Sequence, residues 1–319
     1  MSESYGTKKV WQILSEIRER KDKMEICKKL EVIFIAALVL FLIIATVHYV
    51  KYDMRKFGIY MTFFVISVVV ALFFARQEVL QREAIKELLG RNVIRDIIAE
   101  EVQLIEYDPV FDINRELKNM CTILPGYNYS KANDYIRGKY KGAEFTYFDL
   151  HLRDGVEQAQ HDAFKGQVIR LVLKKDLGIT IKFKKKDNPR SDVRKIETIK
   201  NAIGAFSAGK YETEIKVGHE RFDGFYSVMT NDEEKALALL TEERLNRISE
   251  MMQLACSYTN VEFSGKNVFI TIDNNIDAFS NNASIYDERS LENACELYRN
   301  DLKQILEIME KMIVNEELF

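Results

Sequence analysis

Two long runs of apolar residues stand near the start of the chain. Residues 32–50 read VIFIAALVLFLIIATVHYV and residues 59–75 read IYMTFFVISVVVALFFA, and neither run holds an acid, a lysine or an arginine. As an α-helix the first run would be about 28 Å long, close to the thickness of the bilayer hydrocarbon. Because only eight residues connect the runs, the pattern predicts an antiparallel hairpin of two transmembrane helices over residues 32–75.

Two other interpretations of these runs are weaker. A pair of buried core helices is the first, but helices of soluble proteins rarely stay apolar on every face over this length. A cleaved signal peptide is the second, but the first run begins only at residue 32, behind a long charged segment. Because the runs hold no Asp, Glu, Lys or Arg, we expect a membrane anchor rather than a channel or a pump.

The basic residues around the two runs indicate how the hairpin is oriented. Residues 12–31 hold six Lys and Arg and residues 76–95 hold five, whereas the connection at 51–58 holds three. Basic residues beside transmembrane helices favour the cytoplasmic side of the membrane. We therefore expect both ends of the chain to lie in the cytoplasm.

Helical patterns continue on both sides of the predicted hairpin. Residues 1–31 contain a charged amphipathic helix that begins at about residue 7. Its apolar face holds Val10, Leu14, Ile17, Met24 and Cys27. Residues 76–106 place apolar side chains on two sides of a helix, which then needs neighbours on both. We expect these two segments to be cytoplasmic stalk helices that pack together.

The remaining residues, 107–319, have the pattern of one cytoplasmic α+β domain. Alternating or β-branched runs predict seven strands, at residues 133–140, 144–152, 166–175, 178–185, 211–217, 260–265 and 267–274. Helical spacing follows in 231–256, with Asn231 or Asp232 and then Thr241 as candidate N-caps, and in 286–316. Strands and helices without regular alternation indicate an α+β fold.

The final predicted helix carries an apolar stripe. Its members are separated by alternating steps of four and three residues, which is a three-heptad pattern. Such a stripe packs on the domain's own sheet, or it contacts a partner or a second copy of the chain. The candidates for partner contact are Leu291, Tyr298, Leu302, Ile305 and Met309.

The charge of the chain is unevenly distributed. A net charge of −3 excludes a uniformly basic nucleic-acid binder, and we expect no nucleic acid as a partner. Residues 165–200 are nevertheless strongly basic, whereas residues 211–319 are strongly acidic. The basic run could contact anionic lipid, or it could be a solvated strand edge protected by lysines. The candidates for lipid contact are Lys182, Lys184, Lys185 and Lys186.

No complete catalytic or cofactor motif is present. Residues 204–211 resemble a phosphate loop, but Tyr211 stands where the magnesium-binding Ser or Thr would be. Residues 219–223 begin like HExxH, but Asp223 replaces the second histidine. Residues 273–284 begin like a calcium loop but lack its glycine and its final glutamate. The four cysteines lie far apart, without a CxxC pair. We expect no cofactor and no metal ion.

The densest group of histidines and acids remains the candidate for catalysis. It lies in and after the predicted strand 144–152 and consists of Asp149, His151, Asp154, His161 and Asp162. Asp149 and His151 share one face of that strand because side chains alternate with a period of two. An enzyme that uses this group on a membrane-proximal substrate is one hypothesis for the function.

Several segments resemble a bacterial family of membrane proteins, the domain of unknown function 3137. The resemblance spans about residues 32–280, including the predicted hairpin, and rests on order and spacing rather than on reactive residues. Its most typical segment corresponds to residues 222–228 followed by 232–241, although this chain has Asp223-Gly224 where the family has a Glu-Lys pair. The other matching segments are residues 142–151, 164–166, 261–263 and 267–270.

The resemblance implies a protein of the bacterial inner membrane. It also suggests a LemA-like membrane protein as a partner, since genes of the two families can lie near each other. It supplies no catalytic residue. The hypothesis that we favour is a membrane-anchored, non-enzymatic binding or scaffolding protein, because no set of nucleophile, base and metal is visible. Self-association through the stalk helices is a further hypothesis.

Overall fold

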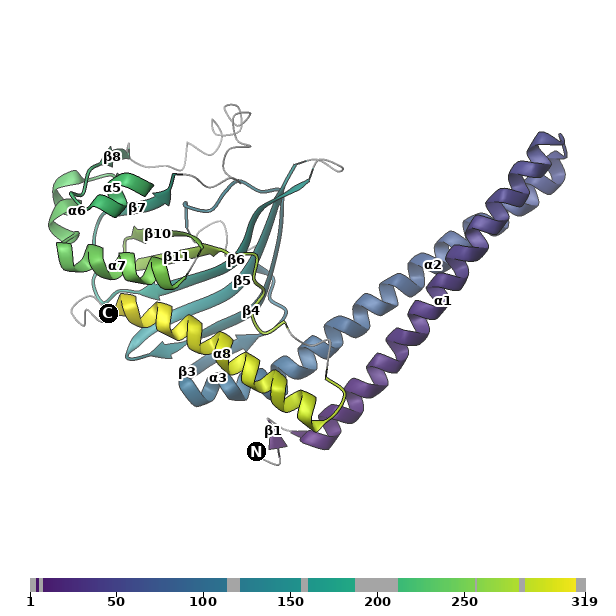
Figure 1. The fold of residues 1–319 in the computed structure, drawn as a ribbon, viewed down its shortest axis with the longest axis horizontal. Helices are drawn as coiled ribbons and strands as arrows, with labels where there is room; N and C mark the ends of the chain where they lie inside the picture. The colour runs from purple at the N-terminus through teal and green to yellow at the C-terminus, as the bar shows by residue number, and fades with distance from the viewer. Residues whose placement is uncertain are drawn as a thin grey trace. The chain divides into compact units, whose positions relative to one another are not determined.

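Two very long helices dominate the first part of the chain. The computed structural model describes residues 4–5, 8–113, 121–155, 160–186, 212–255, 257–280 and 285–313. After a small pair of strands, β1 (Ser4–Tyr5) and β2 (Lys8–Lys9), helix α1 runs from Val10–Val50 and α2 from Met54–Leu89. They lie antiparallel, side by side (Figure 1). The amphipathic helix and the first apolar run therefore form one uninterrupted helix.

Aromatic and small residues hold the two helices together. Phe34 stacks on Phe74 and Phe41 stacks on Phe63, with ring centroids 5.9 and 5.4 Å apart. The small residues Ala45, Ser67 and Ala71 are buried, so the backbones approach closely there. The connection is only three residues, and Asp53 caps α2 by accepting a hydrogen bond from the Lys56 amide.

The predicted helix over residues 76–106 ends earlier than expected. Helix α2 passes through a π-helix, η1 (Gly90–Ile94), into α3 (Arg95–Glu101), and β3 (Gln103–Asp108) follows. Residues 103–106 are therefore strand, not helix. The chain forms two compact units, Met1–Val93 with Asn281–Cys295 and Ile94–Ser280 with Glu296–Phe319. The second unit contains the whole of the large sheet.

Nine antiparallel strands form that sheet, in the order β3-β4-β5-β6-β11-β10-β7-β9-β8 (Figure 1). All seven strands expected from the pattern are present, and β3 and β9 were not expected. The remaining bounds are β4 (Tyr129–Tyr140), β5 (Ala143–Asp154), β6 (His161–Val172), β7 (Thr180–Lys185), β8 (Thr213–Ile215), β9 (Tyr226–Thr230), β10 (Tyr258–Ser264) and β11 (Asn267–Asp273).

Helices and this antiparallel sheet make the fold α+β, as expected. The helices are α5 (Glu220–Phe225), α6 (Glu233–Leu239), α7 (Glu242–Leu254) and α8 (Glu288–Ile313). Asp232 and Thr241 are the N-caps of α6 and α7, and their side chains accept hydrogen bonds from the Lys235 and Arg244 amides. Both residues are among the candidate caps expected from the sequence.

Both faces of the sheet are packed. On one face, Tyr147 of β5 contacts Phe279, which in turn contacts Tyr298 of α8. On the other face, Phe148 and Leu150 of β5 belong to a core that Phe111 and Leu124 cover. Alternating side chains of β5 thus enter two different cores, which explains why eight of its twelve residues are buried.

Candidate functional site

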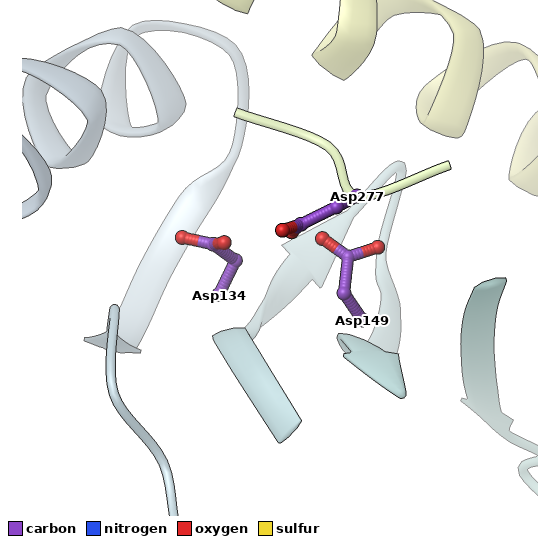
Figure 2. A group of neighbouring side chains, drawn as sticks. All are labelled: Asp134, Asp149 and Asp277. Carbon is purple, nitrogen blue, oxygen red and sulfur yellow. The ribbon is translucent and has the colours of Figure 1, made fainter. Parts of the chain in front are cut away.

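Three aspartates come together where β4, β5 and the loop after β11 meet (Figure 2). Asp134 lies in a bulge of β4, and its φ of 52° puts it in the left-handed region. Asp149 lies in β5 opposite Asn133, and Asp277 lies in the loop that follows β11. Their carboxylate oxygens are all within 4.8 Å of one another. Of these three residues, sequence analysis singled out only Asp149 for catalysis.

Neighbouring donors orient the three carboxylates. The Tyr107 hydroxyl donates to Asp134 Oδ1 at 2.7 Å, and the Tyr147 hydroxyl donates to Asp149 Oδ1 at 2.8 Å. The Ala278 amide donates to Asp149 Oδ2 at 3.0 Å. Asn133 Nδ2 donates to Asp277 Oδ1 at 2.6 Å.

The two tyrosines stay protonated in this environment. Burial raises the pKa of both the Tyr107 and the Tyr147 hydroxyl well above the ordinary value, and the adjacent aspartates raise it further. Asp134 and Asp149 are buried, whereas Asp277 is exposed. The tyrosines therefore remain hydrogen-bond donors that hold two buried carboxylates in fixed directions.

Carboxylate oxygens arranged in this way are ligands that Ca²⁺ and Mg²⁺ accept. Acidic groups of this kind are also common without an ion, so the cluster alone assigns no cation to the protein. The calcium-like spacing 273–277 does not form one site. Asp273 Oδ1 accepts a hydrogen bond from the Lys165 amide, and only Asp277 joins the cluster.

The histidine and acid group predicted from the sequence is brought together only in part. His151 Nε2 lies 2.6 Å from Asp162 Oδ1, and Arg153 Nε lies 3.4 Å from the same oxygen. Asp154 and His161 are opposite each other in the β5–β6 pairing. Asp149 belongs to the aspartate cluster instead.

Three of the four lysines predicted to meet lipid lie on the inner strand β7, and Lys186 directly follows it. β7 pairs with β10 on one side and β9 on the other, so it is not the strand edge that the sequence left open as an alternative. Lys182 pairs with Glu212 at 2.6 Å, and the Lys185 ammonium lies 4.6 Å from the Tyr258 ring centroid. The Lys186 ammonium donates a hydrogen bond to the Asp223 carbonyl oxygen. Lys184 also has an interaction partner. The basic residues of 187–200 lie outside the described residues.

The apolar stripe of α8 points into the protein. Its members named for partner contact are all buried within this chain. For Tyr298, the neighbour is Phe279 of the same unit. Burial of this kind favours the alternative of packing within the chain's own fold for these five residues: Leu291, Tyr298, Leu302, Ile305 and Met309.

One buried acid was not predicted. Glu262 of β10 accepts hydrogen bonds from the Thr122 amide and hydroxyl at 2.9 and 3.2 Å. Burial raises the pKa of its carboxyl, although Lys182 and these hydrogen bonds act in the opposite direction. Burial also raises the pKa of the Cys121 thiol to about 12, so this cysteine is not a thiolate nucleophile at neutral pH.

The remaining near-matches to known motifs do not form sites in the described residues. Asp223, which replaces the second histidine of HExxH, accepts hydrogen bonds from the Val217 and Gly218 amides at 2.9 and 3.0 Å. It therefore holds the turn before α5. The phosphate-loop-like residues 204–211 lie outside the described residues.

Comparison with known proteins gives a family match. Residues 162–313 match the model of a family described as "Protein of unknown function (DUF3137)", which confirms the resemblance seen in the sequence. The predicted association with LemA-like proteins stays a prediction. No curated protein matches the sequence.

One solved structure is similar at low identity. It is the crystal structure of the mycobacterial trehalose monomycolate transport factor A, TtfA, with 10% identity and a TM-score of 0.34. The similarity covers 68% of this chain and 95% of that chain. A likeness of this TM-score supports no conclusion on fold or function.

Proposed function

We propose that this chain, whose residues 162–313 belong to the DUF3137 family, is a membrane-anchored binding or scaffolding protein of the bacterial inner membrane. The observation that carries the proposal is the surface of α1 and α2. In the most apolar 18-residue stretch of each helix, only 6% is buried in α1 and only 11% in α2. Water would solvate such a surface at high cost, whereas lipid tails would cover it.

The polar side chains of the two apolar stretches support a lipid environment. The hydroxyls of Thr46, Thr62 and Ser67 each donate to the carbonyl four residues earlier in the same helix, at 2.8–3.0 Å. In hydrocarbon no water can satisfy such groups, so an internal partner is required. Lys51, Tyr52 and Arg55 are exposed in and beside the short connection, as expected at a membrane surface.

Extraction and labelling test this proposal. After alkaline carbonate washing of membranes, we expect the full chain to stay in the pellet. In a variant whose native cysteines are replaced, a maleimide that cannot cross membranes should label Tyr52→Cys in spheroplasts but not Lys266→Cys. Release by carbonate would contradict the anchor. Labelling at Lys266→Cys would contradict the cytoplasmic orientation of the sheet domain.

The binding role needs a partner. Crosslinking in intact cells followed by detergent extraction should recover a stoichiometric membrane partner, with a LemA-like protein as the first candidate, or a second copy of the chain. Recovery of the uncrosslinked chain alone, at all expression levels, would contradict a scaffolding role.

The alternative function is an enzyme that uses His151 and Asp162. The 2.6 Å contact between the imidazole and the carboxylate is the observation that favours it, since this is the spacing of a general base and its orienting acid. In a deletion strain that the wild-type gene complements, neither His151→Gln nor Asp162→Asn should then complement. Full restoration by both variants would exclude this alternative.

A further inference from the structure

Two lysine side chains converge on one backbone oxygen of α5. Lys186 directly follows β7, and Lys216 directly follows β8, which are the strands on either side of β9. The Lys186 ammonium donates to the Asp223 carbonyl oxygen at 3.1 Å, and the Lys216 ammonium donates to the same oxygen at 3.3 Å. Because they share one acceptor, the two positive charges stand side by side.

No carboxylate pairs with these two charges in the part of the chain that the structure describes. Each ammonium group bonds to the carbonyl oxygen and makes no ion pair there. The Asp223 carboxylate accepts hydrogen bonds from the Val217 and Gly218 amides instead. By contrast, Lys182 of β7 pairs with Glu212 at 2.6 Å. The convergence therefore concentrates positive charge at one point of the surface.

Stabilising the end of α5 does not account for both lysines. Basic side chains near a helix C-terminus offset a partial negative charge, which amounts to about half an elementary charge in a long helix. α5 has only six residues, and its Glu220 and Arg221 carry opposite charges. Even together with the Asp223 carboxylate, this partial charge is smaller than the charge of two ammonium groups. Since like charges side by side repel, a bound anion would stabilise the pair.

The surface beside the two lysines is open and partly apolar. Gly224 is exposed, and a Cβ added there would meet nothing within 4 Å. Phe225 is 60% exposed, and its carbonyl oxygen accepts a hydrogen bond from the Lys186 amide at 3.0 Å. A ligand on the ammonium groups is therefore not blocked at residue 224 and has an apolar residue beside it.

We propose that Lys186 and Lys216 bind the phosphate group of a phosphate monoester, beside the exposed side chain of Phe225. A phosphate monoester carries a charge of about −1.5 to −2 at neutral pH, which matches two ammonium groups. Its oxygens accept charge-assisted hydrogen bonds from both lysines. The inference goes beyond the proposed function, because it holds whether or not the hairpin crosses a membrane.

Calorimetric titration of the full chain in a mild non-ionic detergent tests the inference, with the detergent alone as the blank. The probes are glycerol 3-phosphate and dihexanoyl phosphatidic acid, which carry the same phosphate monoester without and with apolar chains. We expect wild type to bind at least one probe, and Lys186→Gln with Lys216→Gln to raise Kd by about tenfold or more. Failure to bind either probe, or an unchanged Kd in the double variant, overturns the inference.

The two probes distinguish a lipid headgroup from a soluble ester. A lower Kd for phosphatidic acid, lost in Phe225→Ser, identifies a lipid whose chains cover that residue. Equal Kd values for the two probes identify a soluble ester. Both results support the phosphate site, provided that the lysine double variant weakens binding.

Two further variants make the result specific. Lys131→Gln with Lys266→Gln removes two exposed lysines that lie apart on the same compact unit, and should change Kd by less than about twofold. Lys186→Arg with Lys216→Arg keeps both charges and should keep binding. Thermal unfolding shows that each variant is folded. A loss in the Lys131/Lys266 variant as large as in the Lys186/Lys216 variant overturns the inference, because general charge attraction would then explain the binding.

Discussion

The long helices α1 and α2 and the nine-stranded sheet place their apolar side chains in opposite ways. In the sheet, Phe148 and Val168 have no exposed surface, whereas Leu40 of α1 and Leu72 of α2 are 54% and 65% exposed. The sheet buries its apolar side chains against one another, whereas the hairpin leaves them on its outside, where lipid would cover them in the proposed membrane anchor.

Polar side chains show the same contrast. In the hairpin, Thr46, Thr62 and Ser67 bond to a carbonyl of their own helix. In the sheet domain, Asp149 and Glu262 bond to groups far away in the sequence, including Ala278 and Thr122. Polar side chains such as Asp149 and Glu262 thus connect distant segments of the domain, whereas Thr46, Thr62 and Ser67 bond only within their own helix. Substitutions should consequently have unequal effects in the two regions.

The largest effect is expected from a core deletion in the sheet. Phe148→Ala leaves a cavity in the core that includes Leu150 and Phe164, and should lower the free energy of unfolding by about 3–5 kcal/mol. Leu40→Ala is the matched change on the exposed side of the hairpin, and should change the free energy of unfolding by less than about 0.5 kcal/mol. Thermal unfolding in detergent measures both, and equal losses would remove the distinction between the regions.

A charge on the hairpin should affect insertion rather than folding of the sheet. Val39 is exposed in the middle of the apolar run, and Val39→Arg should disfavour membrane insertion by about 3 kcal/mol. Val39→Leu is the control. The fraction of chain in carbonate-washed membranes measures insertion. An arginine variant that inserts like wild type would be evidence against lipid around this helix.

Removing a buried acid should cost more in the sheet than removing a hydroxyl in the hairpin. Asp149→Ala leaves the Tyr147 hydroxyl and the Ala278 amide without their acceptor, and should destabilise the domain by about 2–3 kcal/mol. Ser67→Ala removes only a bond to its own helix and should be nearly neutral. Hydrogen exchange at residues 277–280 should rise in the first variant alone.

Glycines give a smaller test of the same contrast. A Cβ at Gly166 in β6 would lie 1.9 Å from the Ile272 carbonyl oxygen, so Gly166→Ala forces paired strands apart and should cost about 1–3 kcal/mol. At Gly58 in α2 a Cβ would meet nothing within 4 Å. Gly58→Ala should therefore be neutral or stabilising by up to about 1 kcal/mol. The change in melting temperature decides between these outcomes.

The smallest expected effect is a change in pH dependence. Because burial raises the pKa of the Glu262 carboxyl, the folded protein holds a proton that the unfolded chain releases as the pH rises above the ordinary glutamate pKa. The free energy of unfolding therefore falls as pH rises through that window. Asp301 acts in the same direction, because burial raises the pKa of its carboxyl too.

Glu262→Gln should flatten this dependence while keeping an acceptor for Thr122. Asp301 would leave part of the slope in place. Melting temperatures measured from pH 4.5 to 7.5 test the expectation, and an unchanged slope in the variant would contradict it.

Local patterns were sufficient for most of the fold. Alternating or β-branched residues identified β5, β6, β10 and β11, and the caps Asp232 and Thr241 marked α6 and α7. β3 was missed because Ile105 continues the helical spacing of the residues before it, and pairing with β4 overrides that spacing. β9 is a short strand that directly follows α5, and only its pairing with β7 and β8 defines it.

The aspartate cluster could not be derived in the same way. Asp134 reaches it through a bulge of β4, and Asp277 through a loop after β11, so their proximity to Asp149 depends on strand register. For the α8 stripe the periodicity was correct, but periodicity does not say which surface covers an apolar face. Spacing likewise could not tell that β7 lies inside the sheet.

The continuity of α1 has a consequence for evolution and for engineering. A helix of 41 residues without a break turns by about 100° for each residue added. A single alanine inserted just before residue 32 would rotate the charged half of α1 by more than a quarter turn relative to its apolar half. Natural insertions or deletions at that point should therefore keep the two halves in the same rotational register, as changes of seven or eleven residues nearly do.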